Sequence, residues 1–432
     1  MKSFSYTLGI VVLSFSFLSA RAEALPPLTL QQAHETALRN HPRISVAELT
    51  ALASRQSARQ ARAGFFPQVS ANVVAVGTAE NNTRLAAIGA LNNPSIFDRN
   101  AEGLMISQLI TDFGRTANLS QSAKLRARAA EQKTQATREQ ILLAVDGAFF
   151  SALQAQAVTR VAQQTVTNRQ VLLDQVSALA SNKLRSELDV SFAKVNLEDA
   201  RLLWSRTQND LQASFTQLAN LMGLTEPRSY QLLEQPLPAP ASTNVADFVQ
   251  QALRQRPDLL SLRNEQQAAL RFARAERAAR YPTIAAVGSA GVVPIHDPQL
   301  QEDAYAAAGL TLTVPLYAGG LYAARQEEAA LRAQAAEAAV RDQENNVIRD
   351  VRITWLNAQN AFERLQISRN LLENARQSFN LAQARYKEGI SSIVELNQAQ
   401  LNEISAEISY ANTQYEYLLQ RSALSFQTGV LR

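Results

Sequence analysis

The chain contains an internal duplication, and this feature constrains its fold more than any other. Ala37-Leu38-Arg39 recurs 215 positions later as Ala252-Leu253-Arg254. At a later offset of 206 the matches are Gly114 with Gly320, Ser186 with Ser392, and Gly223 with Gly429. A period this long indicates two copies of one architecture rather than a short-repeat solenoid. Because the offset falls by nine, the first copy is expected to carry a longer exposed loop.

Residues 1–22 have the pattern of a secretory signal peptide. Lys2 supplies the positive start, residues 8–18 form an apolar run, and small residues allow cleavage after 22 or 24. This run is shorter than the roughly 20 residues that a membrane-spanning helix needs. We identify no later segment as a transmembrane helix, so the mature chain is expected to be exported, either soluble or inserted as a β-barrel. The absence of cysteine excludes disulfides and thiolate metal sites.

Each copy follows one predicted plan. The first structural repeat covers 25–223, the second covers 244–432, and a Pro-rich linker at 224–243 joins them. In each repeat a capped helix, a helix restarted by Pro, a β-hairpin and a long helical hairpin follow in order. We place the β-hairpins at about 67–112 and about 282–316. The linker is expected to cross the surface and to stay outside the core.

Two very long helices dominate the predicted secondary structure. Residues 115–180 contain one Gly and no Pro, and residues 321–387 contain neither. Each would extend about 100 Å, so other helices must run beside it. The return helix at about 187–222 has the 3-4 apolar spacing of a coiled-coil seam. Together with the helix at 43–64 it nearly matches the long helix in length, which predicts that the two stack end to end alongside it.

Four strands per chain cannot close a barrel, and open strand edges are not tolerated in lipid. Oligomerisation solves this problem: a dimer would give eight strands with a filled interior, and a trimer would give twelve strands and a pore. Aromatic residues lie at the strand ends, where they form either a girdle at one membrane interface or a packed helix–strand junction. They are Phe65, Phe66, Phe113, Tyr281 and Tyr317.

Several short motifs occur in a specific order along nearly the whole mature chain. They are the two Pro restarts at 40–42 and 255–257, the strand-to-helix turns Thr111-Asp112-Phe113-Gly114-Arg115 and Pro315-Leu316-Tyr317-Ala318-Gly319-Gly320, and Arg385-Tyr386-Lys387-Glu388-Gly389. With the duplication, this order resembles the TolC-like outer membrane channel family. The resemblance implies a mainly α protein with a small β part, in which a long coiled-coil α-barrel is joined to a trans-subunit outer-membrane β-barrel.

The resemblance further implies a homotrimeric duct in the outer membrane with its helical tunnel in the periplasm. Such a duct serves a tripartite efflux pump or a type I secretion system. It exports small molecules or proteins passively, together with a periplasmic adaptor and an inner-membrane pump.

The resemblance also implies a pore constriction at the periplasmic tip. By matching positions, Glu395 would be the acid that rings the lumen, and Tyr386 would tie inner to outer helices with Asp189 as its partner. Three carboxylates around a narrow pore favour cations. A second interpretation stays open, because Ser392-x-x-Glu395 is a capping box and Ser186-x-x-Asp189 is nearly one.

This sequence departs from the family pattern at two tip positions. Gln398 occupies a second acidic position, and Ser391 stands where a basic residue is expected. Arg185 is the repeat mate of Ser391 and is the candidate to replace it. The closing bonds of the tip therefore need a different arrangement here.

Other function classes find little support in the sequence. No nucleophile–base pair is recognisable, so we expect neither an enzyme nor a cofactor. His34 and His41 lack metal-ligand spacing and are expected at the surface. The formal charge of +4 is spread along the chain, which does not favour nucleic-acid binding. The alternative function is a periplasmic coiled-coil scaffold or adaptor without a pore, although an adaptor would need β-rich modules around one helical hairpin.

Overall fold

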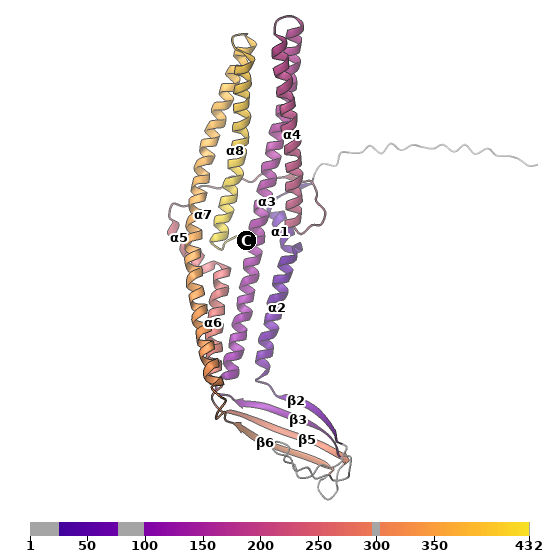
Figure 1. The fold of residues 1–432 in the computed structure, drawn as a ribbon, viewed down its shortest axis with the longest axis vertical. Coiled ribbons are helices and arrows are strands. Elements are labelled where there is room, and N and C mark those ends of the chain that lie inside the picture. The colour runs from indigo at the N-terminus through magenta and orange to yellow at the C-terminus, as the bar shows by residue number, and fades with distance from the viewer. Residues whose placement is uncertain (1–25, 77–98, 296–302, 432) are drawn as a thin grey trace, which may run out of the picture.

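A computed structural model describes residues 26–76, 99–295 and 303–431; the predicted signal peptide and most of both hairpin loops lie outside these ranges. The described chain is a long helical rod with one β-sheet at its end (Figure 1). Its first half comprises β1 (Pro27–Leu28), α1 (Leu30–Asn40), α2 (Pro42–Ala63), β2 (Gln68–Val76), β3 (Arg99–Thr111), α3 (Arg115–Ser181) and α4 (Glu187–Leu221). The second half comprises β4 (Gln231–Leu232), α5 (Val245–Gln255), α6 (Pro257–Ala278), β5 (Thr283–Ile295), β6 (Ala304–Thr313), α7 (Leu321–Lys387) and α8 (Ile393–Gln427).

Local sequence explains where the helices begin. Thr29 and Gln32 form the reciprocal capping box at the start of α1. Pro42 and Pro257 occupy the first turns of α2 and α6, where a missing N–H leaves no hydrogen bond unmade. At the start of α3, the Asp112 carboxylate accepts hydrogen bonds from the backbone N–H groups of Gly114 and Thr116 at 3.1 and 2.7 Å. These contacts satisfy donors that the first turn of a helix leaves free.

The predicted stacking of short helices beside long ones is confirmed. The helix α3 has 67 residues, whereas α2 and α4 have 22 and 35. Both short helices pack on α3, and Figure 1 shows them following one another along it. In the second half α6 and α8 pack on α7 in the same way. Contacts of α3 with α6 and α8 join the two halves into one rod.

The two β-hairpins form a single antiparallel sheet with the strand order β2-β3-β5-β6. Among the described elements, β2 and β6 are each paired on one side, so both edges of this sheet carry unpaired backbone groups. The chain thus supplies the four predicted strands as one continuous piece of wall. A sheet with two free edges cannot lie in hydrocarbon unless further strands pair with it.

The two faces of the sheet differ in polarity. Residues paired across the strands point to the same face, and one face carries Val69, Ala71, Val73, Leu104, Ile106, Ala290, Val292, Ala306, Leu310 and Leu312. On β3 this apolar band lies between Glu102 and Gln108, about 20 Å apart at the rise of an extended strand. At the tilt of about 40° that strands have in outer-membrane barrels, this length spans about 15 Å of the roughly 25 Å apolar band of such barrels. The opposite face is more mixed: it carries Ser70, Asn72, Ser107, Ser289 and Thr311 together with Val74, Met105, Leu109, Val287 and Tyr305.

The main hydrophobic core lies near the middle of the rod and corrects the expectation for the linker. Leu232 is 3% exposed and belongs to this core, and Ala241 is also buried. The Tyr417 hydroxyl donates to the backbone oxygens of Pro238 and Ala239. Prolines prevent long regular structure in the linker, but the side chains between them remain free to pack.

The expectation that His34 and His41 lie at the surface was wrong. The His34 Nε2 lies 2.5 Å from an Asp146 carboxylate oxygen on α3, and Asp146 also accepts a hydrogen bond from Ser422 on α8. His41 is buried, and its ring accepts a hydrogen bond from the Arg43 backbone as the cap of α2. Burial with the Arg43 charge nearby lowers the pKa of His41.

One described helix, α3, is long and apolar enough to span a membrane, which was not predicted from the sequence. Its most apolar 18-residue window has a mean hydropathy of 1.5, and 50% of that window is buried. The same helix contributes Ile141, Phe149 and Leu153 to the main core. Packing inside the rod therefore accounts for this apolar composition.

Candidate functional site

The candidate site is the end of the rod farthest from the sheet, where both long helices turn (Figure 1). The two turns have the same backbone hydrogen bond, from Leu184 N to Leu179 O and from Ile390 N to Arg385 O, each 2.9 Å long. This is the six-to-one bond that closes a helix C-terminus. A left-handed residue is needed there, and it is Lys183 in one turn and Gly389 in the other.

The two return helices are capped differently, which corrects the sequence expectation. Ser186 and Asp189 form the full reciprocal box at the start of α4. Ser392 accepts a hydrogen bond from the Glu395 backbone, but the Glu395 side chain does not reach back to it. Glu395 is instead 3.3 Å from the Arg385 Nε on α7. The acid of the first copy is therefore committed to its cap, whereas Glu395 is exposed and held by one exposed arginine.

Arg185 links the first helical hairpin to the second. Its guanidinium donates a hydrogen bond of 3.0 Å to the Tyr386 backbone oxygen. The same guanidinium lies 4.3 Å from the centre of the Tyr386 ring, within the range of a cation–π contact. Arg185 thus places a positive charge beside Tyr386, although it comes from the opposite hairpin to Ser391.

Tyr386 is buried in a small apolar cluster at the tip. It is 6% exposed and packs with Val176, Ile393 and Leu396. Its hydroxyl has no hydrogen-bond partner within the described chain, so the expected bond to Asp189 is not formed. Burial raises the pKa of the Tyr386 hydroxyl, opposed by the Arg185 charge and reinforced by Asp189.

Ser391 and Gln398, the two positions that depart from the family pattern, have different surroundings. The Ser391 hydroxyl is buried and makes no hydrogen bond within the described residues. The Gln398 side chain is exposed and donates to Asn402 one turn along α8, at 3.0 Å. Neither side chain links the two hairpins.

A second polar link between the hairpins was not predicted from the sequence. Arg169 on α3 is 2% exposed and donates a hydrogen bond of 2.7 Å to Asn397 on α8. Burial lowers the pKa of Arg169, and the Asp199 charge partly offsets this. The repeat mate of Arg169 is Ala375. The signal that could have identified this link is a charged residue in a buried helical seam whose repeat mate is an alanine.

Each turn also presents an apolar pair to solvent. Leu184 and Leu188 are 70% and 63% exposed, and their repeat mates Ile390 and Val394 are 68% and 60% exposed. Large apolar residues at such exposure in equivalent places indicate a contact surface.

Within the described residues, no group of three or more His, Cys, Asp or Glu side chains is placed to hold a metal ion. The tip combines charged and apolar side chains around two helical turns. Such a site can narrow a passage, select ions by their charge and bind another protein.

Comparisons with known proteins identify the family of the chain. A family model described as outer membrane efflux protein matches residues 33–224 and 248–430. A probable efflux pump outer membrane protein, TtgC of Pseudomonas putida, is 26% identical over 388 residues, which cover 88% of this chain and 78% of that protein. The alkaline protease secretion protein AprF of Pseudomonas aeruginosa is 22% identical over 426 residues, covering 96% and 87%.

Two solved structures show the same fold. The Campylobacter jejuni CmeC outer membrane channel matches with a TM-score of 0.78 and 16% identity, covering 99% of this chain and 95% of that one. The Neisseria gonorrhoeae MtrE outer membrane channel, solved in its open state, matches with a TM-score of 0.75 and 20% identity, covering 93% and 89%.

Proposed function

Because the chain belongs to the outer membrane efflux protein family and is an outer-membrane channel protein, we propose that it is a passive exit duct whose helical tip acts as the gate. TolC-family channels are homotrimeric ducts of tripartite efflux pumps and secretion systems, and they dock an adaptor and an inner-membrane pump. The same fold serves efflux in TtgC and protease secretion in AprF by their names. Cargo choice is therefore assigned to the pump and adaptor rather than to the duct.

The observation that carries this proposal is the four-stranded sheet with one apolar face and two unpaired edges. Val73 and Leu310 on that face are 71% and 73% exposed in the single chain. Three copies joined edge to edge give a closed wall that faces lipid outside and places the more polar side chains inside. A soluble coiled-coil scaffold, the alternative function, has no use for such a face.

At the tip, three Glu395 carboxylates are proposed to ring the lumen. Glu395 is free of its helix cap and, apart from one exposed contact with Arg385 at 3.3 Å, is open to passing cations. Tyr386 and Arg185 hold the second hairpin against the first, so that the ring stays narrow. Asp189 supports this arrangement by capping α4. Gln398 donates a hydrogen bond to Asn402 on α8 and adds no charge to the ring.

The exposed apolar pairs at the turns are proposed as the docking surface for the adaptor. With Leu184 and Leu188 in one turn and Ile390 and Val394 in the other, a trimer presents three copies of each turn. An adaptor that displaces water from these residues could also pull the turns apart, because few side chains bind the hairpins together there.

Single-channel recording in planar lipid films tests the duct and its ring together. The purified protein is expected to conduct with a preference for cations, and Glu395→Gln is expected to weaken that preference. Asp189→Asn is the matched control. This variant should leave ion selectivity unchanged, because the Asp189 carboxylate belongs to the helix cap. A monomeric protein that is soluble without detergent and gives no current would refute the duct; unchanged selectivity in Glu395→Gln would refute the ring alone.

A further inference from the structure

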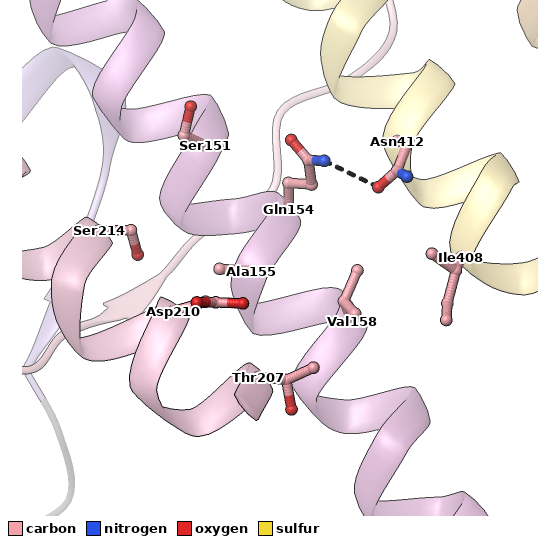
Figure 2. Close-up of a pocket in the computed structure, with 9 residues that line it drawn as sticks. All are labelled: Ser151, Gln154, Ala155, Val158, Thr207, Asp210, Ser214, Ile408 and Asn412. Carbon is pink, nitrogen blue, oxygen red and sulfur yellow. Dashed lines mark hydrogen bonds between the residues drawn. The ribbon is translucent and has the colours of Figure 1, made fainter. Parts of the chain in front are cut away.

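A cavity of about 380 Å³ lies between α3, α4 and α8 in the tip-side half of the rod. Figure 2 shows Ser151, Ala155 and Val158 on α3, Asp210 on α4, and Ile408 on α8 around it. A hydrogen bond of 2.8 Å from Gln154 to Asn412 spans from α3 to α8 at its edge. This volume is enough for a small organic molecule.

The polar atoms on the α4 side of the cavity are hydrogen-bond acceptors, whereas the Ser151 hydroxyl and the amides of Gln154 and Asn412 on the other helices also carry donors. The Thr207 hydroxyl donates its proton to the Trp204 backbone oxygen at 3.0 Å, and the Ser214 hydroxyl donates to Leu211 at 2.7 Å. Because these protons are already engaged, both oxygens offer only lone pairs to a ligand. The α4 side of the cavity therefore favours a molecule that brings its own donors.

Asp210 adds a negative charge to the same set. Within the described part of the chain, its carboxylate forms no hydrogen bond or ion pair, and Figure 2 shows it directed from α4 toward α3. The remaining wall is aliphatic, from Ala155, Val158 and Ile408. One carboxylate, two acceptor hydroxyls and an apolar wall match an alkylammonium ion, with its N–H groups on the oxygens and its chain on the wall.

The position of the cavity on α3 indicates which side it opens to. At 3.6 residues per turn, the cavity residues 151, 155 and 158 lie on the side of α3 opposite to the core residues 145, 149 and 153. The core side is covered by α1 and β4, through the contact of His34 with Asp146 and a 3.4 Å bond from Leu232 N to Gln156.

In a closed trimeric duct this covering layer must lie outside, since three copies of it inside would obstruct the lumen. The cavity then opens to the lumen. This step rests on the proposed function, whereas the chemistry of the cavity does not.

We propose that this cavity is a binding site for organic ammonium ions in the wall of the tunnel, with Asp210 as its charged ligand. The site is separate from the Glu395 ring at the tip. It gives the duct a binding site for amphiphilic cations between the tip and the sheet.

Calorimetric titration of the detergent-purified protein with n-hexylammonium tests this proposal without requiring any current. Asp210→Asn is expected to weaken binding roughly tenfold, as loss of a charge-assisted hydrogen bond does. Tetraethylammonium, which has the same charge and no N–H, is expected to bind weakly to both proteins. Ser214→Ala, a milder change, is expected to weaken binding by roughly threefold.

Asp174→Asn is the matched control, because Asp174 is an exposed acid on α3 that bonds Gln170 at 2.9 Å away from the cavity. It should bind n-hexylammonium like the wild type. Equal binding by the wild type and Asp210→Asn, or an equal loss in Asp174→Asn, would overturn the site. Recording of channel currents in the same preparations keeps the two proposals apart: a conducting protein that fails this titration is a duct without the site.

Discussion

The two turns at the tip began as copies of one sequence and now do different work. Both close with the same backbone bond, and both return helices start from a serine cap. In the first copy the acid Asp189 completes the cap, and Arg185 reaches across to the other hairpin. In the second copy Glu395 is released from the cap, and the mate of Arg185 is a serine without a hydrogen bond in the described chain.

This difference shows that the duplicated backbone sets positions, whereas single side chains divide the roles. The first copy supplies Arg185, which joins the two hairpins, and the second copy supplies the exposed acid Glu395. Five measurements test this division, in decreasing order of the change that each should produce.

Tyr386→Ala is expected to produce the greatest change. Removing a buried aromatic ring should lower the local stability of the tip by about 3 kcal/mol and raise the channel current. Hydrogen exchange across residues 172–196 and 380–400 measures the opening. Tyr386→Phe is the control and should change stability by less than about 1 kcal/mol, because the hydroxyl has no partner in the described chain. If Phe were as damaging as Ala, a hydroxyl partner from a neighbouring subunit would be indicated.

Arg185→Ala should weaken the link between the hairpins by roughly 1–2 kcal/mol, through loss of one charged hydrogen bond and one cation–π contact. An increase in open-channel time would report it. The double variant Arg185→Ala with Ser391→Arg returns the basic residue to the place that the family pattern gives it, and it should recover part of the loss. Unchanged gating in the single variant would remove Arg185 from the gate.

Asp189→Asn and Glu395→Gln should have opposite profiles. Asp189→Asn is expected to lower tip stability by about 1 kcal/mol through its cap, with no change in ion selectivity. Glu395→Gln should lower stability by less than about 0.5 kcal/mol, because its ion pair with Arg385 is exposed, yet it should alter selectivity. The same profile in both variants would contradict the division of roles.

The left-handed positions should respond in opposite directions. Gly389 has φ of 73°, and no atom lies within 4 Å of a methyl group added there, so Gly389→Ala should cost about 1 kcal/mol from backbone strain alone. Lys183 has φ of 61°, and Lys183→Gly should relieve strain by about 0.5 kcal/mol. Thermal unfolding of matched preparations compares the two, and a loss of stability in both variants would contradict this expectation.

The weakest change should be a pH dependence at the tip. Since burial raises the pKa of Tyr386, the unfolded tyrosine ionises first as pH rises past about 10, and the folded state then holds more protons than the unfolded state. The free energy of unfolding should therefore be intact below that pH and fall above it. Hydrogen exchange with Tyr386→Phe as the reference separates the contribution of Tyr386 from that of the other tyrosines. Identical pH profiles in the two proteins would exclude a contribution from Tyr386.

The internal repeat and the positions of Gly and Pro were enough to predict the order of the helices and strands. The 215 and 206 offsets, Pro42 and Pro257, and long runs without Gly or Pro predicted both helical hairpins and both β-hairpins. These features act through the chain's own backbone, as a missing N–H or a blocked conformation does, so neighbours in sequence suffice to reveal them.

Which side chains meet was settled by tertiary packing. Arg169 with Asn397, His34 with Asp146, and Arg185 with Tyr386 join residues more than a hundred positions apart, and no local spacing encodes such pairs. The same holds for the caps, because Ser392-x-x-Glu395 permits a box that the nearby Arg385 competes for. Local sequence limits what each side chain can do, and the packing of four helices against one another selects among those options.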